Sequence, residues 1–411
     1  MSKHLLFVAF SGFGSVNPTL PLVEELVHRG HRVDYATGVE YSTAVTRAGA
    51  RWVELPSYEL FVPQQNPGPD SVVAWMRHQF AAMRGIFPLL LEYCRAERPD
   101  AICYEALHWP GRVVAELLGL PAVRGVPHFA SNDSYALFGS MLDEVGPRHP
   151  GLMELHAACL DFSVEHGVTV TPAGTLDQVD ELNLVFIPRE FQPQGESFDG
   201  SFHFVGPSVG SRERTTSWEP PVPGTPLLYL SLGTVLTGRP EFYRAVVDAF
   251  ADGPWHVAVT VGGLDPDEID PLPRNVEVRA QFPQPAVLRH AAVFASHAGM
   301  NSVMEALYYG VPLVTLPYTP EQVANAARVE GLGLGRRLDP GTVTADSLHA
   351  AVARVAADGA LHARLSRMRE VVRGCGGARR SAEVIEEVLA VRPAGVAPQG
   401  RVRGVPQAAR G

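Results

Sequence analysis

The sequence predicts an α/β protein made of two doubly wound domains that face each other across a central cleft. Its length of 411 residues exceeds what one hydrophobic core usually organises, so two domains are expected. Strand and helix patterns alternate in both halves of the chain, which is typical of parallel sheets covered by helices. A segment rich in Gly, Ser and Pro separates the two halves.

The first half begins with a strand pattern at 4–10, a helix pattern that ends at Gly30, and a strand pattern at 31–36. Asn17 and Pro18 are predicted to open this helix, with Asn as its N-cap and Pro in the first helical position. A strand, a helix and a strand in this order form a βαβ unit, which requires parallel pairing. Further strand patterns continue to residue 187, so residues 1–205 are assigned to a first Rossmann-like domain.

The segment 206–226 is predicted to be the interdomain linker, because its Pro and Gly residues cannot sustain regular structure. Residues 227–390 repeat the alternation and form a second Rossmann-like domain, whose last helix is expected to pack back on the first domain. Residues 391–411 mix Arg with Pro, Gly and Ala and are predicted to be a disordered tail. Ligands of such sheets bind beyond the carboxyl ends of the strands, so each domain can offer one substrate site to the cleft.

The composition excludes several classes of protein. An apolar share of 46% and a charged share of 19% are ordinary for a globular enzyme and do not fit a disordered chain. The formal charge of -10 argues against nucleic acid as a partner. No run approaches the roughly 18 apolar residues of a membrane span, and the chain starts with a strand pattern instead of a signal peptide. The four cysteines are widely spaced, so we expect free thiols in a cytoplasmic protein.

A candidate anion site lies where a strand pattern ends and a helix pattern begins, from His297 to Ser302. Backbone N–H groups and the helix dipole attract phosphate at such a position. Gly299 allows close backbone approach, and Asn301, Ser302 and His297 can donate hydrogen bonds to phosphoryl oxygens. A diphosphate therefore fits here without a metal ion or a lysine.

Polar residues extend this site toward the C-terminus. Glu305 lies about one helical turn beyond Ser302 and can accept hydrogen bonds from both hydroxyls of a ribose. Glu321 and Gln322 follow the next strand pattern and open the next helix pattern, a position suited to sugar hydroxyls. The stretch from Gln281 to Gln322 thus predicts a site for a nucleoside diphosphate sugar.

These residues resemble the macrolide-type glycosyltransferases of the two-domain GT-B architecture, which are related to plant glucosyltransferases. The resemblance covers nearly the whole chain. It rests on motifs that occur in order and at the family's spacing: Gly14-Ser15-Val16-Asn17-Pro18-Thr19-Leu20, Tyr229-Leu230-Ser231-Leu232-Gly233-Thr234, Gln281-Phe282-Pro283-Gln284, His297-Ala298-Gly299-Met300-Asn301-Ser302, Glu305-Ala306-Leu307 and Glu321-Gln322-Val323-Ala324-Asn325-Ala326.

The resemblance implies a role for each donor residue. His297 would contact the α-phosphate, and Asn301 with Ser302 the β-phosphate. Glu305 would bind the ribose, and Glu321 with Gln322 the donor sugar. The donor site would be completed by Ser231, Gly233, Thr234, Gly299 and Met300.

One departure from the family concerns the base of the nucleotide. Where the family usually has an aromatic residue, commonly Trp, this chain has Gln281, followed by Phe282. A Gln can hydrogen-bond a pyrimidine edge but loses a stacking contact of about 1–3 kcal/mol. The donor is therefore expected to be a UDP- or dTDP-sugar, with both alternatives open.

A second departure concerns the general base. The family places a His before Val-Asn-Pro, oriented by an Asp after a later strand, whereas this chain has Ser15 and Glu105 there. In a first alternative, which we favour, Glu105 removes the acceptor proton directly or through Ser15, with a pKa raised by desolvation. In a second, the base is His108 or His128. In a third, an acidic acceptor needs no strong base.

The acceptor is expected on the first domain, near an apolar helix pattern that suits a hydrophobic aglycone and equally suits a helix core. The residues in question are Trp75, Met76, Phe80, Met83 and Phe87.

The sequence therefore predicts an inverting, metal-independent hexosyltransferase that acts on a hydroxyl of a hydrophobic natural product, such as a macrolide, a polyketide or a phenolic aglycone. No resident cofactor is expected, and Asp265-Pro266-Asp267 is interpreted as a surface turn instead of a metal site. A homodimer is an open alternative to a monomer. The non-enzyme alternative is a catalytically silent relative that binds nucleotide sugar and assists another transferase.

Overall fold

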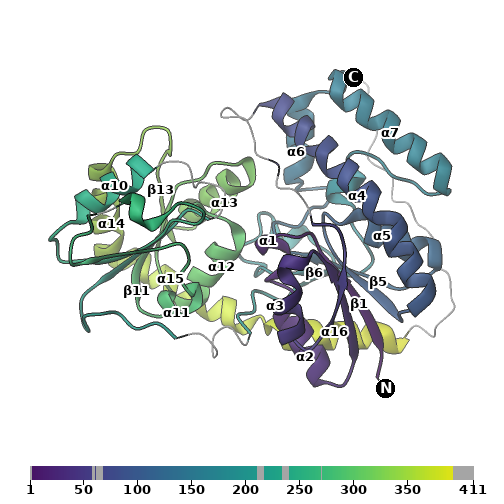
Figure 1. The fold of residues 1–411 in the computed structure, drawn as a ribbon, viewed down its shortest axis with the longest axis horizontal. Helices are drawn as coiled ribbons and strands as arrows, with labels where there is room; N and C mark the ends of the chain where they lie inside the picture. The colour runs from purple at the N-terminus through teal and green to yellow at the C-terminus, as the bar shows by residue number, and fades with distance from the viewer. Residues whose placement is uncertain are drawn as a thin grey trace.

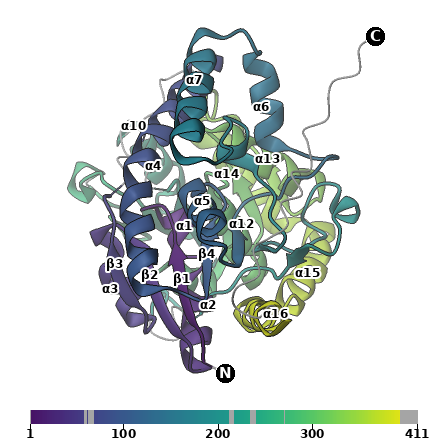
Figure 2. The same cartoon turned by 90° about the vertical axis from the view of Figure 1, so that its right-hand side faces the viewer.

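The computed structural model describes residues 2–57, 61, 68–210, 217–233, 240–269 and 271–391, with side chains up to residue 390. Two parallel sheets, each with helices on its faces, form two lobes that lie side by side (Figure 1 and Figure 2). Within the described residues, no helix is both long and apolar enough to cross a lipid bilayer.

The first sheet has seven strands in the order β3-β2-β1-β4-β5-β6-β7, all paired in parallel. Its strands are β1 (His4–Val8), β2 (Arg32–Thr37), β3 (Arg51–Glu54), β4 (Ala101–Glu105), β5 (Ala122–Val126), β6 (Asn183–Val185) and β7 (Phe202–Phe204). Its helices are α1 (Phe13–Val16), α2 (Leu20–His28), α3 (Ser42–Arg47), α4 (Pro69–Glu97), α5 (Trp109–Leu118), α6 (Leu137–Val145), α7 (Pro150–His166) and α8 (Gly174–Asp177).

The second sheet has six parallel strands in the order β10-β9-β8-β11-β12-β13. Its strands are β8 (Leu227–Ser231), β9 (His256–Thr260), β10 (Val276–Arg279), β11 (Ala291–Ser296), β12 (Leu313–Thr315) and β13 (Gly335–Arg337). The helices that follow them are α10 (Pro240–Phe250), α11 (Gln284–Leu288), α12 (Met300–Tyr309), α13 (Pro320–Gly331), α14 (Ala345–Ala357), α15 (Gly359–Gly374) and α16 (Gly377–Val391).

The strand order reverses beside the first strand of each sheet, between β1 and β4 and between β8 and β11. Ligands of doubly wound sheets bind at such switch points, beyond the carboxyl ends of the strands. Ser15 follows β1, and Glu105 ends β4. In the second domain, Ser231 ends β8, and His297 follows β11. The topology therefore brings the predicted site residues of each domain to the switch point of its own sheet.

The start of the first helix differs from the prediction. Asn17 is the C-cap of the short helix α1, and α2 starts at Leu20 with Thr19 as its N-cap. The Thr19 hydroxyl donates to the Val16 carbonyl at 2.8 Å and pairs with the Tyr35 hydroxyl at 2.6 Å. These two bonds fix a turn between α1 and α2, which no local pattern around Asn17 reveals.

The last helix, α16, returns to the first domain, where Figure 1 shows it crossing beneath β1. Its Glu386 carboxylate accepts from Arg29 at 2.8 Å and pairs with His31 at 3.0 Å. At a separate contact, the Arg328 guanidinium of α13 donates to the carbonyl oxygens of Glu190, Phe191 and Gln192 at 2.8–3.2 Å. Both contacts join the two lobes.

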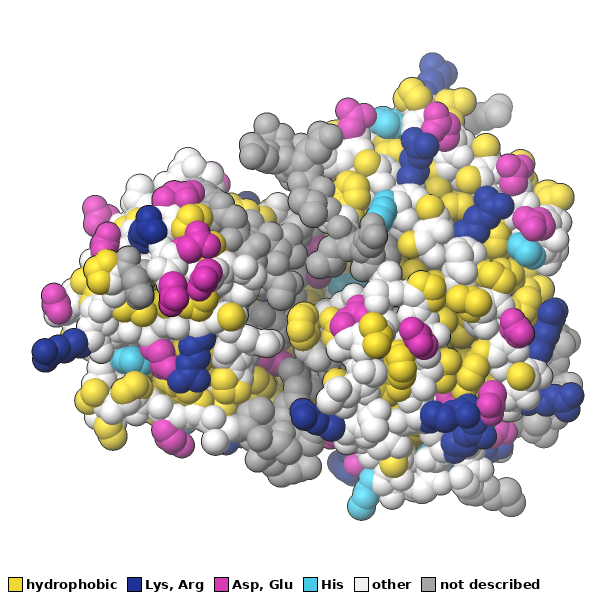
Figure 3. All heavy atoms as spheres, viewed as in Figure 1, with side chains coloured by type: hydrophobic (Ala, Val, Ile, Leu, Met, Phe, Trp, Pro, Cys, Tyr) yellow, Lys and Arg dark blue, Asp and Glu magenta, His cyan; other side chains and the backbone are white. Residues whose placement is uncertain are grey.

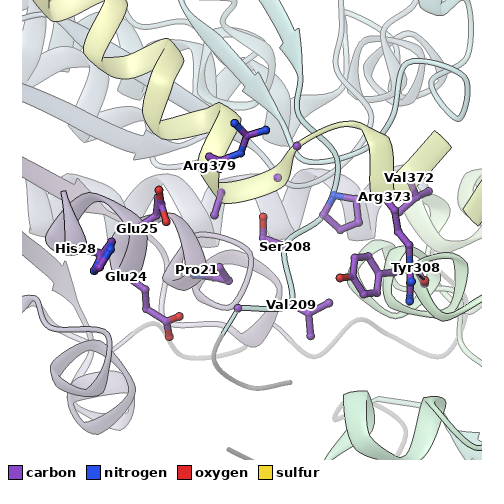
Figure 4. A pocket seen from close by; sticks show the side chains of 15 residues that line it. Pro21, Glu24, Glu25, His28, Ser208, Val209, Tyr308, Val372, Arg373 and Arg379 are labelled. Carbon is purple, nitrogen blue, oxygen red and sulfur yellow. Dashed lines mark hydrogen bonds between the residues drawn. The ribbon is translucent and has the colours of Figure 1, made fainter. Parts of the chain in front are cut away.

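A groove lies where the chain passes between the lobes, among α2, residues 207–210 and the start of α16 (Figure 4). Ser208 and Arg379 line it together with Glu24 and Tyr308. It contains none of the predicted site residues. On the face drawn in Figure 3, Lys and Arg side chains are scattered among acidic ones.

Candidate active site

The loop that follows β11 is held in a strained conformation. Ala298 has a positive φ of 65°, which a non-glycine residue rarely adopts, and its side chain is fully buried. Its N–H donates to the Ser296 hydroxyl at 3.2 Å. Strain of this kind is often concentrated at ligand-binding sites. The loop delivers the chain to the N-terminus of α12, where the N–H groups of the first turn have no intrahelical acceptor and favour an anion.

His297 occupies a slot between two glycines. A Cβ on Gly233 would lie 2.9 Å from the imidazole Cε1, and a Cβ on Gly299 would lie 2.5 Å from Nε2. Only glycine therefore fits on either side of the ring. Burial lowers the pKa of His297 to about 4, so the imidazole is neutral near pH 7 and keeps one N–H to donate to a phosphoryl oxygen.

The predicted ribose contact, Glu305, is held by a residue that the sequence analysis did not assign. Gln284, in the first turn of α11, donates to the Glu305 carboxylate at 2.8 Å and to the Ser302 hydroxyl at 3.3 Å. Gln284 thus fixes the two side chains of α12 relative to each other. In the sequence, the only signal for Gln284 was that it is the fourth residue of the motif that begins at Gln281. Its contact with α12 depends on the fold, which brings α11 next to α12.

Other predicted donor residues take positions that modify their predicted roles. Gln281 is exposed, whereas the Phe282 ring is 4% exposed and packs on Trp218, Tyr229 and the Arg279 guanidinium. The Phe282 side chain therefore belongs to the core beneath the site, and it offers no ring face to a nucleotide base.

The side chain of Met300 is likewise buried in this core, which leaves its backbone N–H as the group at the helix start. Ser231 ends β8 opposite Ser296, and Gly233 follows it beside His297. Thr234 lies outside the described residues.

Asn301 connects the donor helix to the first domain. Its side-chain amide donates to the carbonyl oxygens of Phe13 and Gly14 at 3.4 and 3.2 Å. In this structure the Asn301 amide thus bonds to the backbone of the first domain. The contact places the α1 turn, and with it Ser15, next to the start of α12.

Glu321 and Gln322, the pair predicted to face the donor sugar, lie in the first turn of α13. The Gln322 side-chain oxygen accepts from the N–H groups of Tyr318 and Thr319 at 2.9 and 3.2 Å, so it caps the helix. Burial raises the pKa of Glu321. The buried Asn325 amide donates to the Ala298 carbonyl at 3.0 Å and to Glu321 at 3.5 Å. Asn325, which was not assigned from sequence, thereby links the Glu321 carboxylate to the strained loop after β11.

Glu105 ends β4 with only 2% of its surface exposed, and its Oε2 has no hydrogen-bond partner among the described residues. Burial raises the pKa of this carboxyl to about 8; a backbone hydrogen bond from Leu107 and the charge of Arg124 oppose the shift, and Glu321 adds to it. A base with a pKa near the working pH is well matched to proton transfer.

His108 and His128, the two alternative candidates for the general base, are expected to be weaker bases than Glu105. His108 is fully buried, and neither ring nitrogen has a partner among the described residues. His128 is also buried, and its Nδ1 lies 2.8 Å from the Phe129 carbonyl. Burial lowers the pKa of both imidazoles to about 4, so each holds a proton far less tightly than Glu105. The electrostatics of the site favour Glu105.

The apolar helix α4 contributes mostly to the core. Met76, Phe80, Met83 and Phe87 are buried, and the Phe80 ring stacks on Trp109 at 5.5 Å. Trp75 is partly exposed and stacks on Phe138 of α6 at 6.2 Å. Of the five residues considered for acceptor contact, Trp75 alone retains accessible surface for it.

Comparison with known proteins identifies the class to which this fold and site belong. Residues 223–370 match the family described as UDP-glucoronosyl and UDP-glucosyl transferase. The chain is 37% identical to demethyllactenocin mycarosyltransferase of Streptomyces fradiae, over 94% of this chain and 86% of that protein. It is 36% identical to the NDP-glycosyltransferase YjiC of Bacillus subtilis (strain 168), over 94% and 97% of the two chains.

The crystal structure of CalG4, the calicheamicin glycosyltransferase, superposes with a TM-score of 0.82 at 36% identity and covers 95% of this chain and 99% of that chain. The chain therefore belongs to the nucleotide-sugar glycosyltransferase family and is a glycosyltransferase of GT-B architecture. The predicted fold class is confirmed. The prediction of an enzyme is also confirmed, and the silent alternative is set aside.

Proposed function

We propose that the protein is an inverting glycosyltransferase that moves a hexose from a UDP- or dTDP-sugar to a hydroxyl of a hydrophobic natural product, such as a macrolide, a polyketide or a phenolic aglycone. The observation that carries this proposal is the donor loop, where Gly233 and Gly299 frame His297 at the N-terminus of α12. The buried Glu105 carboxyl at the end of β4 supplies the candidate base in the other domain. The names of the relatives above, a mycarosyltransferase and a calicheamicin glycosyltransferase, support this acceptor class.

In the proposed mechanism, the acceptor hydroxyl gives its proton to Glu105 as its oxygen bonds to the anomeric carbon. The bond from that carbon to the diphosphate breaks at the same time, and the leaving charge is stabilised by His297 and by the N–H groups that begin α12. Attack from the face opposite the leaving group inverts the anomeric configuration. Glu321 and Gln322 hold the sugar hydroxyls, and Glu305 holds the ribose.

The chemistry of this site requires no metal ion or resident cofactor, so we propose a metal-independent enzyme whose only co-substrate is the nucleotide sugar. The four cysteines are unpaired, which fits a reducing, cytoplasmic environment. We leave monomer and homodimer as alternatives for measurement by light scattering.

The test is incubation of the protein with UDP- and dTDP-sugars and a panel of macrolide, polyketide and phenolic aglycones, with products detected by mass spectrometry. We expect a product one hexose heavier than its aglycone, formed equally well with and without a chelator. Release of nucleoside diphosphate without any glycosylated product across the panel would contradict the proposal.

A further inference from the structure

A second group of buried polar side chains lies in the first domain, outside the residues used above. Arg124 on β5 is fully buried, and its three guanidinium nitrogens have no hydrogen-bond partner among the described residues. The nearest acid is Asp177 at the end of α8, whose oxygen lies 3.9 Å from the guanidinium and whose two oxygens are also unpartnered there. The buried His128 Nε2 and Ser131 hydroxyl share this property.

The same domain contains an Arg–Asp pair whose hydrogen bonds are made, between the exposed Arg51 and the buried Asp34. Asp34 accepts from Arg51 at 2.8 Å and also bonds to His4, Arg32 and Tyr93. At 3.9 Å the Arg124–Asp177 pair is too long for a hydrogen bond, so attraction between the charges does not replace the bonds lost on burial. An open pair of this kind has donors and acceptors available for the polar atoms of another molecule.

The position of the open pair connects it to the catalytic side of the cleft. Arg124 pairs with Tyr104 across the two strands, in the register next to Glu105, and its charge reaches the Glu105 carboxyl. On the other side, the His128 ring contacts Phe138 edge-on at 5.3 Å, and Phe138 stacks on the partly exposed Trp75. The cluster therefore begins on the strand next to the one that carries the candidate base, and it contacts the aromatic residues of α6 and α4 through His128.

The charges in the cluster define what it can hold. Arg124 and Asp177 cancel, so neither an anion nor a cation is favoured. His128 is neutral, and its Nδ1–H is directed to the Phe129 carbonyl, which leaves Nε2 as an acceptor. A neutral hydroxyl satisfies this set, because its oxygen accepts from the guanidinium while its hydrogen is donated to Asp177 or His128.

We propose that Arg124, Asp177 and His128 form a subsite that holds a hydroxyl of the acceptor other than the one that receives the sugar. This inference rests on the proposed function, because it assumes that the acceptor is bound by the first domain. A site built to hydrogen-bond a hydroxyl discriminates strongly against an analogue that lacks it.

The test compares the wild-type protein with the double variant Arg124→Met, Asp177→Leu, which replaces the pair by apolar side chains and leaves no unpaired charge. The probes are flavonoid aglycones that differ by one hydroxyl, apigenin with luteolin and kaempferol with quercetin, and binding is measured by calorimetry in the presence of UDP. We expect the wild type to prefer the hydroxylated member of at least one pair by roughly 10-fold or more, and the variant by less than about twofold. The melting temperature should be unchanged or higher in the variant.

The double variant Arg77→Met, Glu154→Leu is the control, because this exposed pair between α4 and α7 lies at 2.8 Å and should not affect the preference. A wild type without preference in either pair, or a variant that keeps the wild-type preference, would overturn the proposal. Because binding is measured without turnover, the failure of sugar transfer alone would remove the proposed reaction but not the subsite.

Discussion

The donor side and the acceptor side of the cleft are built by different means. On the donor side, a strained loop, two glycines and a helix start position His297 through the backbone. On the acceptor side, burial dominates the pKa of Glu105, with smaller contributions from the Leu107 backbone, from Arg124 on β5 and from Glu321 of the other domain. Glycines and helix starts can be recognised as a local motif in the sequence. Burial and the charge of distant residues leave no such motif. The two sides should therefore respond to different kinds of mutation.

The largest effect is expected from crowding His297. The variant Gly299→Val adds a branched side chain whose Cβ alone would lie 2.5 Å from the His297 ring, so the imidazole must move away. We expect the UDP or dTDP dissociation constant to rise by roughly 100-fold or more, as for other displaced site residues. Calorimetric titration checks this, with Gly331→Ala as the control, because nothing lies within 4 Å of a Cβ added there. A wild-type dissociation constant in Gly299→Val would contradict the claim that the two glycines position the His297 ring for nucleotide binding.

A smaller effect is expected from neutralising the ribose contact. Glu305→Gln keeps the side-chain size but replaces charged hydrogen bonds by neutral ones, which should weaken UDP binding by roughly 30-fold. The loss should be smaller for dTDP, because its sugar offers one hydroxyl to Glu305 in place of two. Competition titrations with both nucleotides measure the difference. An equal loss for the two nucleotides would show that Glu305 does not read the ribose.

The acceptor side should respond to pH. With a Glu105 pKa of about 8, kcat/KM should rise by about tenfold between pH 7 and pH 9, because the base must be ionised. A flat profile across this range would assign the proton to another group.

The stability of the folded chain should fall as the pH rises, whereas kcat/KM should increase. Between its usual value near 4.5 and about 8, Glu105 is protonated in the folded chain and ionised in the unfolded chain. The folded chain then binds more protons, so its stability falls as pH rises through this window. The Glu105→Gln variant lacks this pH-dependent contribution. The melting temperature of the variant minus that of the wild type should therefore increase from pH 5 to pH 8. A constant difference between the two would contradict the raised pKa.

The smallest effect is expected where the lobes meet away from both sites. Arg328→Gln removes the guanidinium bonds to the carbonyl oxygens of residues 190–192, which should lower the unfolding free energy by about 1–2 kcal/mol. Donor affinity should change by less than about twofold, since Arg328 contacts no donor residue in these bonds. A large loss of donor affinity would show that the contact between Arg328 and residues 190–192 also determines the geometry of the donor site.

The same contrast explains how much the sequence could predict. The alternation of strands and helices predicted the fold class, and the motif around His297 predicted a helix start at a switch point. The roles of Gln284 and Asn325 were not predicted, because both depend on contacts with other elements of the fold. Local pattern also could not reveal that Phe282 faces the core, or that Asn301 reaches across the cleft to Phe13 and Gly14. In each case the tertiary neighbour, and not the residue type, determines the role.

The most direct test of the central claim is a paired measurement on Glu105→Gln: turnover with a nucleotide sugar and an accepted aglycone, and the dissociation constant for the nucleotide alone. A general base confined to the acceptor side predicts that turnover falls by roughly 100-fold or more while the dissociation constant stays within about twofold of the wild-type value. Turnover close to that of the wild type in this variant would contradict the assignment of Glu105 as the base.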